Sequence, residues 1–347
     1  MKSVIIIGAG INGLMTAYEF NRAGWHVTVV DQGSIPNPKS ASHGLHRLIH
    51  PYTPNKPERV NATKKALNMW HNLWGVLGQT HFYKTGVVLL EKQDVPWLTA
   101  SYKLSFDDAC KLMPILSGST KASAYLFPEY GVLMASQILQ DLVTLLAKLG
   151  VSIRSNQKVQ TINSTTATVA TITGEKFSAD FVVITAGIGT SALLGQMNHW
   201  EGLSQQNFAT KRCFVLYAEL PTTLIPVRSY MPAWTFPAYN DLWGIPLILD
   251  IPLKLGCGSL THTVDTNDLP INENHLVSQF IMHFKEFFPN CSQIKPKLLA
   301  YNHRTQGPTD MAQVFRNDLC YLVSACSGIG FKYAPLTAKT VVDYIDA

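Results

Sequence analysis

A strand, a glycine-rich turn, a helix and a second strand at the N-terminus constrain the fold of this chain more than any other feature. The β-branched run Val4–Ile7 predicts a short buried parallel strand, and the sequence GAGING follows it directly over residues 8–13. From Leu14 to Ala23 apolar residues recur with helical spacing, and HVTVVD then predicts a strand that ends on Asp31. This order is typical of the first unit of a Rossmann-type, doubly wound α/β fold.

The three glycines of this turn have separate physical roles. Gly8 makes the tight turn out of the strand, Gly10 lets backbone approach a pyrophosphate, and Gly13 permits close contact between helix and strand. Ile11 and Asn12 lie between them, where a helix N-terminus presents unpaired N–H groups to phosphates. The turn therefore predicts a dinucleotide-binding site.

The acidic end of the second strand narrows the choice of dinucleotide. Asp31 follows Gly13 by eighteen residues and can accept hydrogen bonds from ribose hydroxyls. An acid at this place disfavours a 2′-phosphate, so we expect FAD or NAD rather than NADP.

Two later segments favour FAD. The strand expected over Phe181–Ile184 is followed by the small residues Thr185–Gly187. Near the C-terminus, a strand expected over Cys320–Val323 leads into the turn Ser327–Gly330, with a helix expected from about Leu336. Segments spread over the whole chain suit one long cofactor, whereas a nicotinamide enzyme usually builds its nucleotide domain from one contiguous block.

Composition excludes several other classes of protein. The 28 Lys and Arg residues against 23 Asp and Glu give a net charge of +5 with no dense basic stripe, so we expect no nucleic-acid partner. No apolar run reaches the roughly 18 residues of a membrane helix, and glycines interrupt the N-terminal one, which disfavours a signal peptide. Six irregularly spaced cysteines predict neither a metal site nor a disulfide scaffold, and favour a cytoplasmic location.

Taken together, the segments resemble the D-amino-acid oxidase-type flavoprotein family, in particular its monomeric sarcosine oxidase and glycine oxidase branches. The glycine-rich N-terminus and the sequence CSGIGFKYAP near the C-terminus are the most specific matches. The other matches, in family order, are SHGLHRLIHPY, YKTGVVLLE, GVLMASQILQDL, FVVITAG and GIPLILDIPLKLG.

The resemblance implies an architecture of two domains. A Rossmann-type FAD-binding domain is expected from the discontinuous segments 1–81, 132–206 and 300–347. A substrate domain with a large mixed or antiparallel sheet is expected from residues 82–131 and 207–299. In the first domain, MASQILQDLVTLLAKLG predicts an amphipathic helix and VSIRSNQKVQTI a strand.

The segment SHGLHR is the part that the resemblance places against the flavin. It implies that Ser42 and His43 line the cofactor and that Arg47 faces the isoalloxazine, where a fixed positive charge stabilises anionic reduced flavin. In some related dehydrogenases a histidine near His43 carries a covalent flavin bond, and this stays an alternative.

The same histidines allow two further interpretations. His43, His46 and His50 have the spacing of one helix face and could form a metal site, but Gly44 and Pro51 disfavour a regular helix there. They could also be ordinary loop histidines. By the resemblance His50 replaces an arginine that sarcosine oxidases use near the substrate carboxylate. We expect a flavin pocket and no metal.

Three cations are implied to act on substrate or oxygen. Lys332 matches a lysine, and Arg304 an arginine, that related oxidases direct at the substrate carboxylate. Lys254 matches a lysine near the flavin's reactive nitrogen, where positive charge favours electron transfer to dioxygen. A solvated surface position is the alternative for each of them. The histidine that the family places four residues after this last lysine is Gly258 here.

Aromatic and cysteine positions complete the expected pocket. Trp243 and Tyr239 form either an aromatic wall beside the flavin or part of the core. No cysteine lies in LLAYNHRTQGPTD, where monomeric sarcosine oxidase would attach its flavin, so we expect non-covalent FAD. Cys326 is expected to be a packed small residue.

The residues predicted to contact FAD come from every part of the chain. They are Gly8, Gly10, Ile11, Asn12, Gly13, Asp31, Ser42, His43, Arg47, Val159, Ala186, Gly187, Ser327, Gly328, Ile329, Gly330, Phe331 and Lys332.

The resemblance implies oxidation of the C–N bond of an amino acid or N-alkyl amino acid. Hydride passes to FAD, water hydrolyses the imine, and dioxygen reoxidises the flavin to give hydrogen peroxide. The alternatives are a dehydrogenase that passes electrons to another acceptor, a modification enzyme for a bulky amine such as a tRNA or a natural-product intermediate, and a non-catalytic FAD-binding protein.

Overall fold

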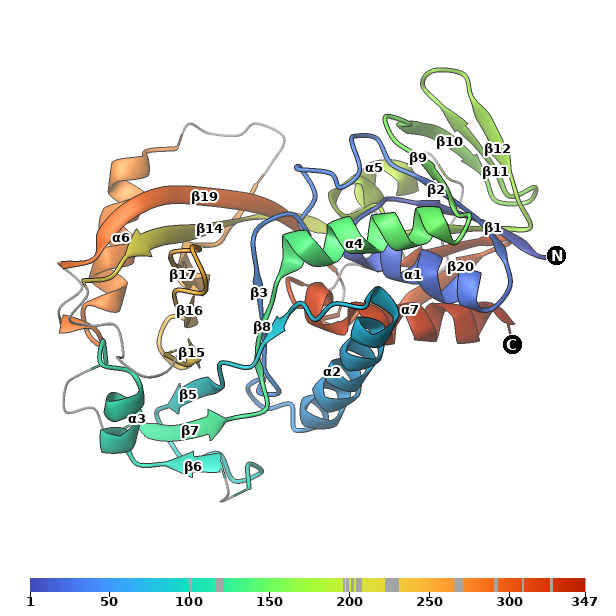
Figure 1. Cartoon of the computed structure of the whole chain (residues 1–347). Helices are drawn as coiled ribbons and strands as arrows, with labels where there is room; N and C mark the ends of the chain where they lie inside the picture. Colours follow the sequence, from blue (N-terminus) through green and yellow to red (C-terminus); the bar gives the residue numbers. More distant parts are fainter. Residues whose placement is uncertain are drawn as a thin grey trace.

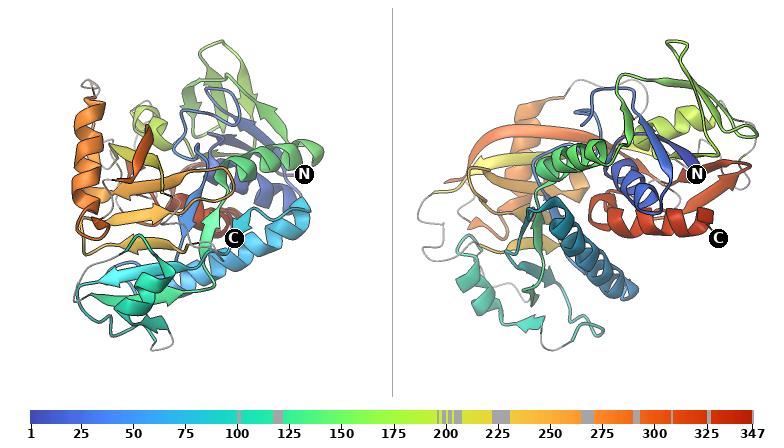
Figure 2. Two further views of the ribbon diagram at one scale, coloured as in Figure 1. Left: turned by 60° about the vertical axis from the view of Figure 1, so that its left-hand side comes forward. Right: turned by 45° about the vertical axis from the view of Figure 1, so that its right-hand side comes forward.

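The computed structural model describes residues 1–99, 102–116, 122–195, 197, 200, 203, 208–221, 231–264, 271–289, 293–307, 309–324 and 327–346. These residues form two halves that meet along a small central sheet (Figure 1). Both termini lie at one end of the molecule, and helix α6 (Glu273–Phe284) lies at the other (Figure 2).

A six-stranded sheet forms the centre of the half that holds both termini. Its strand order is β20-β21-β13-β1-β2-β9. All neighbouring strands are parallel except β20 and β21. The carboxyl ends of β1, β13 and β21 therefore lie at one edge, and the predicted α/β fold is confirmed. The strands are β1 (Ser3–Ile7), β2 (His26–Val30), β9 (Ser152–Arg154), β13 (Phe181–Ile184), β20 (Val314–Asn317) and β21 (Cys320–Val323).

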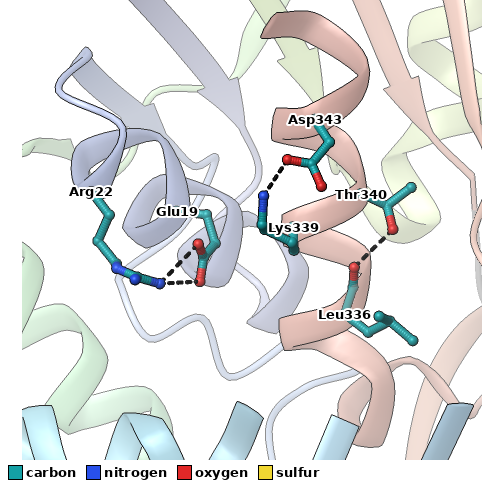
Figure 3. A network of polar contacts seen from close by, with 6 residues as sticks. All are labelled: Glu19, Arg22, Leu336, Lys339, Thr340 and Asp343. Carbon is teal, nitrogen blue, oxygen red and sulfur yellow. Dashed lines mark hydrogen bonds and ion pairs between the residues drawn. The ribbon is translucent and has the colours of Figure 1, made fainter. Parts of the chain in front are cut away.

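Helices cover one face of this sheet. Side chains of α1, α4 and α7 share a core with alternate residues of the central strands, such as Val4, Ile6 and Val183. The polar contacts Glu19–Arg22 and Lys339–Asp343 each stay within one helix, α1 or α7 (Figure 3), so apolar packing dominates between the helices. The helices of this half are α1 (Ile11–Arg22), α2 (Glu58–Leu77), α4 (Ala135–Lys148), α5 (Thr190–Leu194) and α7 (Gly330–Asp346).

Helix α7 begins earlier than the sequence predicts. We expected a helix from about Leu336, and the structure starts it at Gly330 with Pro335 inside it. Its first turns are buried, including Phe331 and Tyr333. Tertiary packing therefore outweighs the proline, whose missing N–H removes one helical hydrogen bond.

A three-stranded sheet, β10-β11-β12, covers the opposite face together with α5. The single strand predicted for VSIRSNQKVQTI is wrong, because the chain turns at Asn156, whose φ is +58°. The first part becomes β9 in the large sheet, and the second becomes β10 in the small one. The elements here are β10 (Val159–Asn163), β11 (Thr168–Thr171), β12 (Lys176–Ser178) and the 3₁₀ turn η2 (Gly187–Gly189).

The other half is built on a nine-stranded mixed sheet. Its order is β18-β14-β17-β16-β15-β5-β7-β6, and β19 also pairs with β14. Neighbours are antiparallel except β15 and β5. The predicted boundary at residue 300 falls inside β19, and the division into domains stays a prediction. The elements are β5 (Val87–Glu91), β6 (Lys103–Leu104), α3 (Phe106–Leu112), β7 (Ser123–Phe127), β14 (Ala209–Glu219), β15 (Ala233–Phe236), β16 (Leu242–Ile245), β17 (Leu253–Cys257), η5 (Gly258–Leu260), β18 (His262–Thr263) and β19 (Lys295–Gln306).

The small central sheet, β3-β8-β4, joins the two halves. Strands β3 (Arg47–Ile49) and β8 (Gly131–Leu133) run side by side between them (Figure 1), and β4 (Phe82–Tyr83) pairs with β8. This sheet carries the SHGLHR segment into the middle of the molecule. Among the described helices, none combines the length and apolar character needed to cross a membrane.

Candidate active site

The first two glycine-containing turns touch at the carboxyl edge of the six-stranded sheet. Gly8 has φ +103°, and a Cβ there would lie 2.7 Å from the carbonyl oxygen of Thr185 and 3.0 Å from Cα of Ala186. The Thr185 hydroxyl donates to the carbonyl oxygens of Ile7 and Gly8 at 3.0 and 2.9 Å. The structure thus brings the first predicted turn against Ala186, which precedes Gly187.

The start of helix α1 is packed too closely for side chains. A Cβ on Gly13 would lie 1.8 Å from the carbonyl oxygen of Gly8. The backbone N–H of Ile11 donates to the Ser42 hydroxyl at 2.9 Å, which brings the SHGLHR loop onto this helix N-terminus. The buried side-chain oxygen of Asn12 has no hydrogen-bond partner among the described residues.

Asp31 follows β2 directly and holds the loop after it against the first glycine-containing turn. Its buried carboxylate accepts hydrogen bonds from the N–H of Ala9 at 2.8 Å, the N–H of Gly33 at 2.9 Å and the amide of Asn37 at 2.7 Å. A carboxylate has about four lone-pair sites, so one acceptor position stays open. The Asp31 carbonyl also accepts from Gln157 N–H at 2.7 Å, shortly before β10 begins at the predicted contact Val159.

The carbonyl oxygen of His46 joins two predicted cations. It accepts from Lys254 Nζ at 3.2 Å and from Arg47 Nη1 at 2.9 Å. Burial lowers the pKa of Lys254 well below its usual value, and the Arg47 charge lowers it further. Lys254 is 4% exposed, which excludes the surface position that the sequence left open.

Arg47 holds its own loop together. Besides His46, it donates to the carbonyl oxygens of Ala41 and His43, and its guanidinium lies 5.7 Å from the ring centroid of Phe331. His43 is exposed and takes part through its backbone. Arg47 therefore links the SHGLHR loop to the first turn of α7.

His46 is a part of the site that we expect from the sequence only as a metal ligand or an ordinary loop histidine. Its side chain is fully buried and stacks on Tyr217, with 6.3 Å between ring centroids. Burial, followed by the Lys254 charge, lowers its pKa to about 3, so the ring is neutral at physiological pH. Within the described ranges, no group of three His, Cys, Asp or Glu residues could hold a metal ion.

Lys332 is the second buried lysine of the region. It is 5% exposed, so it too is no surface cation, and its Nζ donates to the carbonyl oxygen of His50 at 3.2 Å. Burial, and then the charge of Arg59, lowers its pKa to about 7. Burial and the neighbouring Lys332 likewise lower the pKa of His50 well below its usual value. Sequence reasoning missed Arg59, because a lone arginine at the start of a helix resembles a surface residue.

Arg304 lies against the third glycine-containing turn, Ser327–Gly330. Its Nη1 donates to the carbonyl oxygen of Ser327, and a Cβ on Gly328 would overlap the guanidinium at 1.9 Å. The described contacts place it beside this turn and do not bring it to Lys332. Ile329 follows in the same turn, and Gly330 begins α7.

The two predicted aromatic residues have different surroundings. Trp243 lies beside Lys254, whose Nζ is 5.5 Å from its ring centroid, and covers Gly256. Tyr239 packs against Phe287 at 4.6 Å between ring centroids and joins the core of the other half. Of these two predicted residues, Trp243 lies beside a buried cation and Tyr239 does not.

Comparison with known families decides the classification. The family model described as DAO, FAD dependent oxidoreductase, matches residues 3–344.

The chain belongs to this family.

Relatives of this DAO-family chain include two peroxisomal sarcosine oxidases. The human protein is 24% identical over 98% of this chain and 90% of its own length, and the mouse protein is 28% identical over the same shares. Among solved structures, NikD, described as an unusual amino acid oxidase essential for nikkomycin biosynthesis, is similar with a TM-score of 0.78 and 16% identity over 98% of this chain and 93% of its own. L-proline dehydrogenase from P. horikoshii has a TM-score of 0.82 and 16% identity over 99% and 93%. These two structures share the fold.

FAD is the cofactor of this DAO family, and the residues present fit it. The turn around Gly8 leaves no room for a Cβ, which suits backbone that approaches a phosphate. Among the described residues, the Asn12 side-chain oxygen has no donor and the Asp31 carboxylate has only three, so both can accept a hydrogen bond from a cofactor hydroxyl such as that of a ribose. Attachment without a covalent bond stays a prediction, and Cys326 lies outside the described residues.

Proposed function

We propose that this chain oxidises the C–N bond of a small amino acid or N-alkyl amino acid. One observation carries the proposal: a single segment, His46–His50, holds a buried lysine at each end. Lys254 donates to the carbonyl of His46, and Lys332 donates to the carbonyl of His50. Extended backbone rises about 3.3 Å per residue, so the two carbonyls are at most about 13 Å apart. This spacing lets Lys332 bind the substrate while Lys254 stabilises developing negative charge elsewhere in the same site.

The chain's own residues bind and orient in this proposal. Lys332 binds the substrate carboxylate, and Trp243 forms an apolar wall beside Lys254. Arg47 provides a fixed positive charge where negative charge develops, and Lys254 adds to it in its protonated form. When bound, FAD supplies the acceptor for the two electrons of the oxidised C–N bond. The substrate amine enters neutral, so no side chain has to act as a strong base.

The names of the relatives support this substrate class, because several are sarcosine oxidases and one is an amino acid oxidase. Dioxygen as the final acceptor, with hydrogen peroxide as product, is the finer part of the proposal and rests on the buried charge of Lys254. A cytoplasmic location and the absence of a nucleic-acid partner stay predictions.

An anaerobic bleaching screen tests the proposal. The purified yellow protein is mixed without oxygen with D-, L- and N-methyl amino acids, and loss of the visible flavin spectrum is recorded. Air is then admitted, and oxygen consumption and peroxide are measured. Bleaching by an amino acid with rapid return of colour supports the proposal. Bleaching that air does not reverse would indicate a dehydrogenase, and a spectrum that no amino acid changes would overturn the assignment.

A further inference from the structure

Arg59 is a buried cation that the proposed chemistry has not used. It lies in the first turn of α2 and is 6% exposed. Its Nε and Nη1 have no hydrogen-bond partner among the described residues. The carboxylate of Glu58 lies 3.9 Å from its Nε, but that side chain is 68% exposed. Among the described residues, the buried N–H groups of this guanidinium have no acceptor and its one carboxylate neighbour is exposed, so a bound carboxylate would satisfy both the donors and the charge.

Arg59 and Lys332 meet at Tyr333. The Arg59 guanidinium lies 5.9 Å, and Lys332 Nζ 5.1 Å, from the centroid of the Tyr333 ring. The Tyr333 hydroxyl is 2.7 Å from the Thr63 hydroxyl, which donates to the Arg59 carbonyl at 2.8 Å. The Arg59 side chain also hydrogen-bonds Tyr333. Helices α2 and α7 therefore fix both cations against one aromatic ring.

Two further hydrogen bonds hold Lys332 in place, one at its backbone and one at its ammonium group. The indole N–H of Trp70, also on α2, donates to the Lys332 carbonyl at 3.0 Å, and the lysine's ammonium reaches the His50 carbonyl. Two buried cations so close repel each other, because burial weakens screening by water. A bound carboxylate removes this repulsion and satisfies donors on both side chains.

We infer that Arg59 is a substrate-binding residue that, together with Lys332, binds the carboxylate of the substrate. The inference rests on the proposed function and makes it narrower: the site selects amino acids with a free carboxylate over their amides and over simple amines. A guanidinium offers several N–H donors in a planar fork that matches a carboxylate, whereas a lysine adds a point charge.

A merely structural role for Arg59 makes a different prediction. If it only stacks on Tyr333 and supports α2, its replacement would lower stability and weaken all ligands alike. A binding role weakens carboxylates and spares neutral ligands of the same shape. The probes are therefore 2-furoate and its amide, 2-furamide, which differ in charge and carry no oxidisable amine.

Dissociation constants of both probes are measured by titration of the FAD-loaded protein, following its visible spectrum. We expect Arg59→Gln to weaken 2-furoate about tenfold or more and to change 2-furamide less than about twofold. Arg59→Lys should restore much of the loss. Arg22→Gln, at an exposed arginine of α1, is the control and should change neither constant. Equal weakening of both probes, or unchanged 2-furoate binding, would overturn the inference.

A second variant keeps the test decisive if Arg59→Gln fails to fold. Lys332→Met leaves Arg59 as the single buried cation of the pair and should keep a preference for 2-furoate over 2-furamide. If the preference disappears, Arg59 does not bind carboxylates.

Turnover separates this inference from the proposed function. Amino-acid bleaching with an unchanged KM in Arg59→Gln would refute only the inference, and Arg59-dependent 2-furoate binding without bleaching would refute only the oxidation.

Discussion

Lys254 and Arg47 donate hydrogen bonds to the same atom, the carbonyl oxygen of His46, at 3.2 and 2.9 Å. The lysine comes from β17 in the nine-stranded sheet, and the arginine begins β3 in the central sheet. Their shared acceptor fixes two like charges side by side at the junction of the two halves. The site therefore exists only when both halves are folded and docked.

Replacing Lys254 by Met should slow reoxidation of the reduced flavin by oxygen far more than reduction by substrate. The buried positive charge stabilises negative charge that develops during electron transfer to oxygen. Stopped-flow measurement of the two half-reactions separates the effects, and we expect a loss of about 10²-fold or more in the oxygen step. Lys297→Met, at an exposed lysine of β19, is the control. Equal losses in both half-reactions would contradict this role of Lys254.

The same Lys254→Met protein should be more stable than the original at pH 7. The folded-state pKa of Lys254 lies well below its unfolded value of about 10.5. Between these two values the unfolded chain binds more protons, so this group makes the original protein more stable as pH rises. Methionine removes both the free-energy cost of burying the lysine and the pH dependence of stability that the lysine causes. Thermal melts at pH 7 and 9 should show a gain of about 2 °C or more at pH 7 and a smaller one at pH 9. A lower melting temperature at pH 7 would argue against a buried, costly charge.

Gly13→Ala should abolish FAD retention, whereas Gly75→Ala should be harmless. Both glycines are helical, but a Cβ on Gly13 would lie 1.8 Å from a backbone oxygen, and a Cβ on Gly75 meets nothing within 4 Å. Alanine also favours a helix over glycine by about 1 kcal/mol, so Gly75→Ala should stabilise slightly. The measurements are flavin absorbance per protein after gel filtration and the melting temperature. A yellow Gly13→Ala protein of normal stability would disprove the close packing.

Affinity for a carboxylate should fall as pH rises through about 7. The pKa of Lys332 is lowered to about 7, so the lysine is charged and attracts anions below that pH and loses the charge above it. The dissociation constant of 2-furoate should rise between pH 6 and pH 8.5, by at most about tenfold per pH unit. Lys332→Met should remove this dependence. A constant that does not change with pH in the original protein would show that the lysine does not contact the anion.

The cofactor-binding part of the site could be predicted because its signals are local. The runs Phe181–Ile184 and Cys320–Val323 are strands with the predicted bounds, since strands buried on both faces are continuously apolar. The glycines at 8 and 13 were predicted because backbone contact excludes any side chain. In each case one short stretch of sequence determines the structure.

The substrate side could not be predicted in the same way. His46 contributes a backbone carbonyl, which every residue has, so its contact with Lys254 leaves no trace in the sequence. Arg59 becomes a buried cation only because α7 packs on α2 through Tyr333. Tyr239 belongs to an aromatic stretch, but its neighbour Phe287 is distant in sequence. These positions depend on tertiary contacts that the sequence alone does not reveal.

Strand β3, between His46 and His50, sets the distance between the backbone carbonyls that hold Lys254 and Lys332. Because β3 is extended and hydrogen-bonded to β8, the separation of the two lysine anchoring points should change little with the ligand that is bound. An engineer who wants this enzyme to accept longer molecules should therefore leave residues 46–50 untouched and shorten side chains near the two lysines instead. Inserting even one residue there would shift one anchor by about 3.3 Å and turn the following side chains to the opposite face.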